Sequence, residues 1–296
     1  SEWGEIPNFK CFGYYGGMPK LNLKNPEVEK YITDVACYWI KECDIDGWRL
    51  DVGDEISHFF WKNFRKAVKA VKKDMLIIGE IWHYAGDFLE GDEWDTVMNY
   101  PFYLNLIDLL ADEKITVSQF VQNLGYLKGR LHKNCYPLMW NLIDSHDTAR
   151  FLHLCNGNKK KQHLAAAFQL LLPGMPMIYY GDEYAMPGAN DPDCRRGMYW
   201  DEEYQDKEMY EWYKRLIQVR KSHACIVEGE LAGSVTEDAE GTIVLIRKNG
   251  EETIAMIFNC SSSAKKFNEY TQKYNLLTEN TFDGNVEGFD AAVIVL

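Results

Sequence analysis

The sequence lacks the features of membrane-spanning and nucleic-acid-binding proteins. No run of about 18 apolar residues occurs, which predicts no membrane-spanning helix. The 32 basic residues are outnumbered by 45 acidic ones, and a net charge of −13 repels nucleic acid and anionic membranes. We therefore expect neither a nucleic acid nor a membrane among the partners of this protein.

The sequence also lacks the cysteine and histidine spacings of common metal and redox sites. It contains no Cys-x-x-Cys pair and no His-Glu-x-x-His motif, so we predict no metal ligands. Eight cysteines in 296 residues are too dilute for a disulfide scaffold, and free thiols are the simplest interpretation. Residues 1–10 do not resemble a signal peptide. Free thiols are typical of a reducing compartment, so we expect a cytoplasmic location.

What the sequence does contain is typical of a globular protein with about two domains. Apolar residues make up 46% of the chain and charged residues 26%, which gives enough material for a sizeable core. Aromatic residues reach 14%. Aromatic rings fill cores, but their flat faces also stack on sugars, and both interpretations stay open at this point.

Helical patterns alternate with short apolar runs through residue 224. We expect strands near residues 46, 76, 97, 139 (over 137–144) and 176 (over 175–180), with amphipathic helices between them. Asn25 and Ser57 are expected to cap the first two helices, and a further helix is expected near 102–111. This alternation predicts βα units and a parallel sheet. An open doubly wound sheet and a (β/α)₈ barrel both fit this pattern. A barrel has eight strands in about 250 residues, so a barrel here would lack its first three strands.

The pattern changes near residue 225. Strand-like segments at 241–247, 253–258 and 292–296 are separated by Gly, Ser, Asn and Asp. These segments predict a small antiparallel β-sandwich. We therefore divide the chain into an α/β domain over residues 1–224 and a β-domain over residues 225–296.

Three acidic residues follow predicted strands of the α/β domain. Asp51 ends the first strand, Glu80 ends the second and Asp147 follows the fourth. A single acid at such a position has no special meaning, since strand ends are polar. Three acids at the carboxyl edge of a parallel sheet or barrel, where sites assemble, indicate a functional cluster.

Two of these acids have neighbours that predict opposite pKa shifts. Arg49 and Asp51 share one face of their strand, and a cation beside Asp51 lowers its pKa. Glu80 lies among apolar residues, and such a setting raises the pKa of a carboxyl group. One ionised and one protonated carboxyl are what retaining glycoside hydrolysis uses, although Arg49 and Asp51 also fit a structural ion pair.

Six segments of the chain stand out, in this order: Met18–Asn22, Asp46–Val52, Gly79–His83, Ser145–Thr148, Ile178–Glu183 and Asp191–Arg195. Together they resemble signature regions of the α-amylase family of glycoside hydrolases. The first resembles the marker of its neopullulanase, cyclomaltodextrinase and maltogenic amylase branch. The last two resemble the final barrel strand and a substrate-binding loop that follows it.

The resemblance implies a role for each matching catalytic position. Asp51 would be the nucleophile that forms a glycosyl-enzyme intermediate, and Glu80 would protonate the glycosidic oxygen and then activate water. Asp147 would hold sugar hydroxyls and stabilise the oxocarbenium-like transition state. Arg49 would position Asp51, and His146 would hydrogen-bond the sugar just before the cleaved bond.

The resemblance also implies residues for the outer sugars. Asp191 and Arg195 would grip the next sugar outward, and Trp82, His83 and Glu55 would shape the leaving-group side. For Trp82 a role in the core is an open alternative. The implied substrates are α-glucans such as maltooligosaccharides, cyclomaltodextrins or pullulan.

Some parts of the family pattern are missing from this chain. The region at the end of the third barrel strand, the first three strands and the N-terminal β-domain have no counterpart. The resemblance therefore implies the second part of a (β/α)₈ barrel followed by a β-sandwich, and an N-terminal fragment as a partner that completes the site. Smaller departures are Gly53-Asp54, where the branch has Ala-Asn, and Ile143-Asp144 before Ser145.

Two other functions stay open. One is a non-catalytic, amylase-like carbohydrate-binding protein, although such proteins have typically lost acids of the triad that this chain keeps. The other is a glucan transferase of the same family, since water and an acceptor sugar compete for one intermediate. The resemblance implies no required cofactor; it allows structural Ca²⁺, but no oxygen-ligand loop of the EF-hand type occurs.

Overall fold

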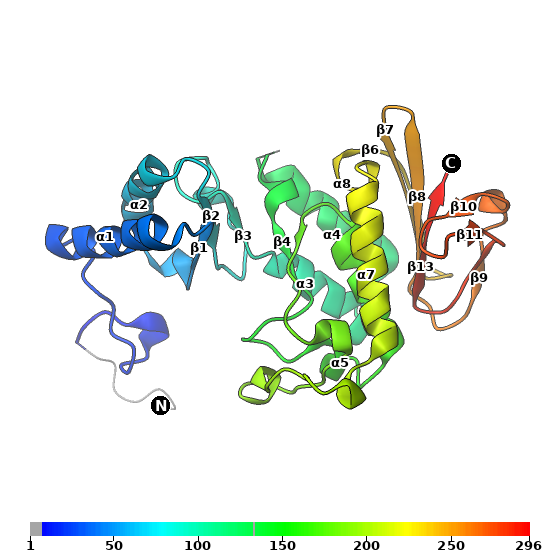
Figure 1. The fold of residues 1–296 in the computed structure, drawn as a ribbon, viewed down its shortest axis with the longest axis horizontal. Coiled ribbons are helices and arrows are strands. Elements are labelled where there is room, and N and C mark those ends of the chain that lie inside the picture. The colour runs from blue at the N-terminus through cyan, green and yellow to red at the C-terminus, as the bar shows by residue number, and fades with distance from the viewer. Residues whose placement is uncertain (1–7, 133) are drawn as a thin grey trace. The chain divides into compact units, whose positions relative to one another are not determined.

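The computed structural model describes residues 8–132 and 134–296, which form two compact units divided between Met98 and Asn99. Figure 1 shows the ribbon of each unit. The prediction of no signal peptide rests mostly on residues 1–7, which lie outside the described residues.

The first unit is a three-stranded parallel sheet with two long helices. The strands pair in the order β1-β2-β3, so each strand has its carboxyl end at the same edge. The helices are α1 (Pro26–Cys43) and α2 (His58–Val71), and the strands are β1 (Gly47–Leu50), β2 (Leu76–Gly79) and β3 (Thr96–Val97). Short 3₁₀ helices lie at η1 (Phe12–Tyr14), η2 (Gly53–Glu55) and η3 (Gly86–Phe88).

Local sequence signals explain where these helices begin. The Asn25 side chain accepts a hydrogen bond from the Glu27 backbone N–H at 2.9 Å, and proline occupies the first helical position of α1. Ser57 caps α2 in the same way, through the Phe60 N–H at 3.4 Å. Both caps were expected from the sequence, and both are present.

Trp94 fills the core of the first unit. Its ring is 1% exposed and stacks on Phe88, with centroids 4.1 Å apart and planes at 7°. Gly79 ends β2 against this ring, and a Cβ atom there would lie 2.2 Å from it. The glycine therefore lets Trp94 pack directly under the strand end that carries Glu80.

The second unit combines helices with an antiparallel sheet. Its helices are α3 (Tyr100–Leu106), α4 (Val117–Arg130), α5 (Phe151–Leu154), α6 (Lys159–Leu171), α7 (Lys207–Ser222) and α8 (Cys225–Glu228), with a π-helical turn at η4 (Ile107–Ala111). Two short strands, β4 (Trp140–Asn141) and β5 (Met175–Pro176), pair in parallel. The remaining short 3₁₀ helices are η5 (Tyr136–Leu138), η6 (Asp182–Tyr184), η7 (Asp193–Arg195), η8 (Glu202–Tyr204) and η9 (Asn268–Tyr270).

The C-terminal sheet has six strands in the order β11-β10-β13-β8-β7-β6, and its pairs are antiparallel. A separate two-stranded ladder pairs β12 with β9. The strands are β6 (Glu230–Glu237), β7 (Thr242–Asn249), β8 (Glu252–Asn259), β9 (Lys265–Lys266), β10 (Tyr274–Asn275), β11 (Asn280–Thr281), β12 (Asn285–Val286) and β13 (Asp290–Val295).

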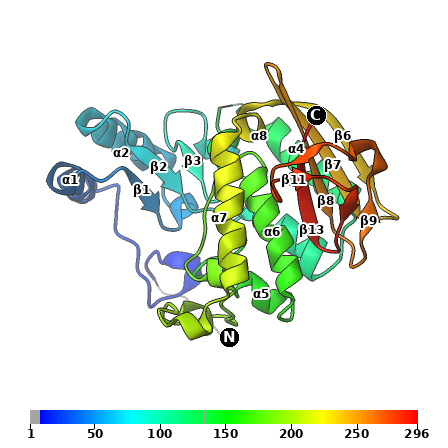
Figure 2. The ribbon, with the colours of Figure 1, turned by 45° about the vertical axis from the view of Figure 1, so that its right-hand side comes forward.

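One continuous core joins α6 to this sheet. In Figure 2, α6 and α7 lie side by side, and the C-terminal strands lie on the other side of α6. Phe168 of α6 stacks on Phe258 of β8, with centroids 4.3 Å apart and planes at 11°, and both side chains are 0% exposed. The opposite face of the sheet has a second, smaller core that includes Phe267 and Val286 near the β9–β12 ladder. The sheet is therefore covered on both faces.

The structure corrects several expected boundaries. The strand expected over 137–144 is reduced to β4, because residues 136–138 form a 3₁₀ turn, and the one expected over 175–180 is reduced to β5. The helix expected near 102–111 ends in a π-helical turn from residue 107. Strand β6 was not expected, because most of its side chains are exposed and it has no run of apolar residues.

Candidate active site

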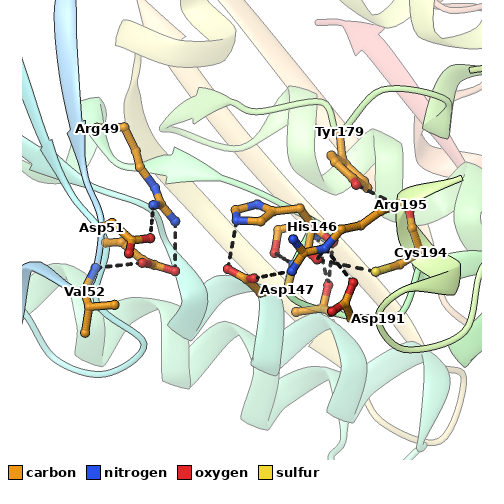
Figure 3. Close-up of polar contacts among 12 residues, drawn as sticks. Arg49, Asp51, Val52, His146, Asp147, Tyr179, Asp191, Cys194 and Arg195 are labelled. Atoms are coloured by element: carbon orange, nitrogen blue, oxygen red, sulfur yellow. Dashed lines mark hydrogen bonds and ion pairs between the residues drawn. The ribbon is translucent and has the colours of Figure 1, made fainter. Parts of the chain in front are cut away.

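Arg49 links the two acids that end neighbouring strands of the first unit. Its Nη1 lies 2.5 Å from Oδ1 of Asp51, and its Nη2 lies 3.0 Å from Oε1 of Glu80 (Figure 3). The parallel register that pairs Arg49 with Ile78 and Leu50 with Gly79 brings these strand ends together. One guanidinium therefore pairs with both carboxylates: it donates a hydrogen bond to Asp51 and forms an ion pair with Glu80.

The two carboxylates differ strongly in exposure. The Asp51 side chain is 74% exposed, whereas the Glu80 side chain is 5% exposed. We expected an apolar setting for Glu80, and its side chain is buried. Its carboxylate nevertheless has polar partners on both oxygens, since Oε2 accepts the Val52 N–H at 2.9 Å and Oε1 lies 3.3 Å from Trp82 Nε1.

The Val52 contact depends on an unusual backbone conformation. Val52 has φ of 45° and ψ of 46°, in the left-handed region that β-branched residues rarely adopt. This turn directs its N–H at Glu80, while the next N–H, from Gly53, donates to the Glu80 carbonyl at 3.1 Å. Backbone strain of this kind is concentrated at functional sites. Here the strained turn links the end of β1 to the end of β2 through these two hydrogen bonds.

Three residues predicted for the leaving-group side also lie in the first unit. Trp82 is 42% exposed, so it is not a core residue. His83 Nε2 lies 3.3 Å from Oδ2 of Asp54, one of the positions where the chain departs from the family pattern. Glu55 forms an ion pair with Lys20 and accepts the Gly13 N–H at 3.3 Å, which ties the Met18–Asn22 segment to η2.

Asp147 is the centre of a cluster in the second unit. His146 Nε2 lies 3.1 Å from its Oδ2, and Arg195 Nη2 lies 3.1 Å from its Oδ1 (Figure 3). Arg195 Nε also donates to the His146 carbonyl at 2.9 Å and lies 2.8 Å from Asp191 Oδ1. Arg195 therefore contacts each of the other three residues predicted to bind sugars in this part of the chain.

A buried group of charges holds the loop that carries Arg195. Arg150 is fully buried, its Nη1 lies 3.1 Å from Asp182 Oδ1, and its Nε donates to the Cys194 carbonyl at 3.2 Å. Its guanidinium carbon lies 4.4 Å from the centre of the Tyr179 ring. These contacts connect the strand end after β5 to the loop, and desolvation strengthens them.

Asp182 has a second acidic neighbour, Asp144, and the two side chains form a hydrogen bond. Burial raises the pKa of Asp144 to about 6 and raises the pKa of Asp182 well above its usual range. Asp182 therefore holds its proton to a higher pH than an exposed aspartate does. Because Asp144 also accepts the Phe151 N–H at 2.7 Å, this proton helps fix the chain just after Asp147.

The structure thus groups the predicted residues into an Asp51–Glu80 cluster in the first unit and an Asp147 cluster in the second. Sequence reasoning missed Arg150 and Asp182 as supports, although both lie inside or beside the quoted motifs. It treated Asp144 only as a departure from the family pattern. A pairing of two buried acids that are 38 positions apart leaves no signal in local sequence.

No metal-ligand cluster was found where the structure can be described. Within residues 8–132 and 134–296, no three histidine, cysteine or acidic side chains form a group that could hold an ion. The helices in the same ranges all fall short of the length and hydrophobicity that crossing a bilayer requires. The eight cysteines are free thiols, as expected.

Comparison with known proteins gives a family match over most of the chain. Residues 6–229 match the model of the alpha amylase catalytic domain. The cyclomaltodextrinase of Geobacillus thermopakistaniensis (strain MAS1) is 46% identical over 258 residues, which are 87% of this chain and 44% of that protein. The intracellular maltogenic amylase of Bacillus subtilis is 43% identical over 253 residues, or 85% of this chain and 43% of that protein.

Solved structures give the same result for the fold. A cyclomaltodextrinase superposes with a TM-score of 0.92 at 35% identity, covering 98% of this chain and 52% of that one. A cyclic α-maltosyl-(1→6)-maltose hydrolase from Arthrobacter globiformis, in complex with its cyclic sugar, has a TM-score of 0.87 at 32% identity, covering 99% of this chain and 65% of that one. The chain spans less than half the length of the Geobacillus cyclomaltodextrinase and the Bacillus subtilis maltogenic amylase.

Proposed function

The chain belongs to the α-amylase catalytic-domain family, and from this premise we propose that it carries the acids of a retaining glycoside hydrolase that acts on α-glucans. The observation that carries the proposal is the contact of one guanidinium, Arg49, with both Asp51 and Glu80. The substrates are maltooligosaccharides, cyclomaltodextrins or pullulan. The names of the relatives, cyclomaltodextrinase and maltogenic amylase, support this substrate class.

In the proposed reaction the two acids act in turn. Asp51 attacks the anomeric carbon and forms a glycosyl ester, while Glu80 gives its proton to the glycosidic oxygen as that bond breaks. Glu80 then takes a proton from water, which hydrolyses the ester and frees Asp51. The 74% exposure of Asp51 supports its role as the group that meets the sugar, and the contacts that hold Glu80 in place support its role as the second, fixed carboxyl group.

The supporting roles follow the family pattern, and the contacts around each acid support them. Asp147 holds sugar hydroxyls and offsets the positive charge that develops on the ring. Arg195, in contact with Asp147 and Asp191, grips the next sugar outward, and His146 hydrogen-bonds the sugar beside the cleaved bond. Trp82, His83 and Glu55 shape the leaving-group side, as the family pattern implies.

We further propose that residues 1–224 supply the second part of a (β/α)₈ barrel and residues 225–296 a separate C-terminal β-sandwich domain. The share of the relatives that the chain covers, 44% and 43%, supports a need for further strands. An unpaired sheet edge and unsatisfied polar groups, each costing about 1–3 kcal/mol, would otherwise remain. An N-terminal fragment of the same protein is therefore the expected partner, and the isolated chain is expected to be inactive.

Two lesser proposals follow. The reaction needs no organic cofactor, because the two carboxyl groups supply the nucleophile and the proton; structural Ca²⁺ stays allowed by the family resemblance. A cytoplasmic location agrees with eight free thiols.

The roles of the two acids are separated by changing the leaving group of the substrate. Glu80→Gln should slow cyclomaltodextrin hydrolysis by about 10²- to 10⁴-fold, the usual contribution of a general acid. It should slow α-maltosyl fluoride hydrolysis far less, because fluoride leaves without a proton. Asp51→Asn should abolish the hydrolysis of both substrates.

The control variant is Glu90→Gln, which removes the same charge from an exposed position. The protein to assay is this chain joined to the N-terminal portion of the Bacillus subtilis maltogenic amylase, with its folding checked by circular dichroism. Equal losses on both substrates for Glu80→Gln, or unchanged activity for Asp51→Asn, would refute the assignment.

A further inference from the structure

Arg150 is buried in the second unit, a few positions after Asp147 in the sequence. Its side chain is 0% exposed, and it directly precedes α5. A buried arginine lowers stability unless its charge is paired and its N–H groups have acceptors. The acceptors that surround Arg150 therefore indicate what this side chain does.

Arg150 binds both ends of the loop over residues 188–195. Its backbone N–H donates to the Gly188 carbonyl at 2.9 Å, and its Nε donates to the Cys194 carbonyl at 3.2 Å. The packing here is close, since a Cβ atom on Gly188 would lie 2.9 Å from Cys194 Cα and 3.3 Å from Arg150 Cδ. Because the Cys194 carbonyl belongs to the peptide unit before Arg195, Arg150 fixes the backbone from which the Arg195 side chain extends.

The Arg195 side chain needs this support from its backbone. It contacts Asp147 Oδ1 at 3.1 Å and the His146 carbonyl at 2.9 Å, but it is 45% exposed. Ion pairs that water reaches contribute little to holding a long side chain in one place. The placement of Arg195 against Asp147 therefore depends on its backbone. The buried Cys194 thiol, which donates to the His146 carbonyl at 3.4 Å, supports the same backbone.

Arginine suits position 150 better than lysine would. Its Nη1 pairs with Asp182 at 3.1 Å while its Nε bonds the Cys194 carbonyl, so one rigid plane joins two segments. The guanidinium carbon also lies 4.4 Å from the centre of the Tyr179 ring and 4.9 Å from that of Tyr180. A lysine would keep the charge, but its single flexible ammonium group cannot reproduce this fixed geometry.

Resting on the function proposed above, we propose that Arg150 is a positioning residue, which holds the loop so that Arg195 meets Asp147 and the sugar next outward. Arg150 is buried, so it acts through Arg195 and does not touch the substrate. Its loss should therefore slow substrates that reach the Arg195 sugar more than substrates that end before it. A side chain that only stabilised the fold would show no such preference.

The test compares two fluorides in the joined protein described above. α-Glucosyl fluoride has one sugar, held by Asp147 and His146, whereas α-maltosyl fluoride adds the sugar that Arg195 grips. Arg150→Lys should lower kcat/KM for α-maltosyl fluoride about tenfold more than for α-glucosyl fluoride, as expected for one hydrogen bond from a charged group. Arg195→Ala should show the same preference. The double variant should show no greater preference than Arg195→Ala alone, because Arg150 acts through Arg195.

Arg220→Lys is the matched control. Arg220 also bonds backbone carbonyls, but these lie at the end of α6, at Leu170 (2.7 Å) and Leu172 (3.2 Å). Whatever this substitution does to stability, it should change kcat/KM for the two fluorides by the same factor.

Equal losses on both fluorides for Arg150→Lys, or a larger preference in the double variant than in Arg195→Ala, would overturn the proposal. If circular dichroism shows that Arg150→Lys does not fold, Gly188→Ala tests the same contact from the loop. It too must slow α-maltosyl fluoride more than α-glucosyl fluoride, and equal losses overturn the proposal. Hydrolysis of neither fluoride by the unsubstituted protein would refute the proposed function and this proposal with it, whereas equal losses refute the role of Arg150 alone.

Discussion

The shared proton of Asp144 and Asp182 makes a specific prediction about stability and pH. Both side chains are shielded from solvent, so screening by water does not reduce the effect. An unfolded aspartate titrates near pH 3.9, whereas folding raises the pKa of Asp182 well above that value. Between these two pKa values the folded protein holds one proton that the unfolded chain has lost.

The sign follows from proton linkage. A group whose pKa is raised by folding stabilises the protein most below its unfolded pKa, and this contribution is lost as pH rises towards the folded pKa. One extra bound proton lowers the free energy of unfolding by about 1.4 kcal/mol for each pH unit. Asp144, with its pKa raised to about 6, lowers the free energy of unfolding in the same way, mostly below pH 6.

The substitution Asp182→Asn should remove the fall in unfolding free energy that Asp182 causes as pH rises. The asparagine amide can donate to Asp144 in place of the carboxyl proton, and its carbonyl oxygen can still accept from Arg150 Nη1. As pH rises from 5, the variant should become more stable relative to the wild type by up to about 1.4 kcal/mol per pH unit, until the pH reaches the folded pKa of Asp182.

Urea unfolding followed by tryptophan fluorescence at pH 5, 6, 7 and 8 measures this difference. Asp74→Asn, at an exposed turn after α2, is the matched control and should parallel the wild type throughout. Parallel curves for Asp182→Asn and the wild type would refute the shared proton. A loss of several kcal/mol at pH 5 would show that the amide cannot replace the carboxyl group.

Three further predictions concern the strained turn, the core and the thiols. Val52→Asn should raise the free energy of unfolding by about 1 kcal/mol, because asparagine tolerates the left-handed region; an equal or lower value in urea unfolding would show an unstrained turn. Phe258→Ala should lower it by about 3–5 kcal/mol through loss of the stack on Phe168, and a loss below about 1 kcal/mol would contradict a shared core. A disulfide reagent at pH 8 should label exposed Cys43 in the folded protein but Cys155 only in denaturant, because Cys155 is buried and burial raises the pKa of its thiol to about 12; equal rates would contradict this.

The sequence predicted the fold best where local signals are strong. Caps at Asn25 and Ser57, and the amphipathic pattern of α2, set helix boundaries that the structure reproduces. Short strands were predicted less well, since the extent of β4 depends on pairing with β5 and not on the apolar run around it. Strand β6 was missed because an exposed strand carries no core pattern.

Prediction of the site also succeeded where the signal is local and failed where it is long-range. Motif positions identified the acids and Arg49, because these residues lie within short, ordered segments of sequence. The left-handed turn at Val52 and the pairing of Asp144 with Asp182 depend on backbone geometry and long-range packing. No local pattern encodes either one, so only the structure could supply them.

The measurement that tests the central claim most directly is covalent trapping of the proposed nucleophile. The protein, joined to the N-terminal portion of the Bacillus subtilis relative and shown to be folded, is incubated with 5-fluoro-α-D-glucosyl fluoride, digested and mapped by mass spectrometry. We predict a glycosyl ester on Asp51, which should persist in Glu80→Gln because fluoride needs no proton to leave. An ester on another residue, or maltotriose hydrolysis by a protein that forms no ester at Asp51, would contradict the account.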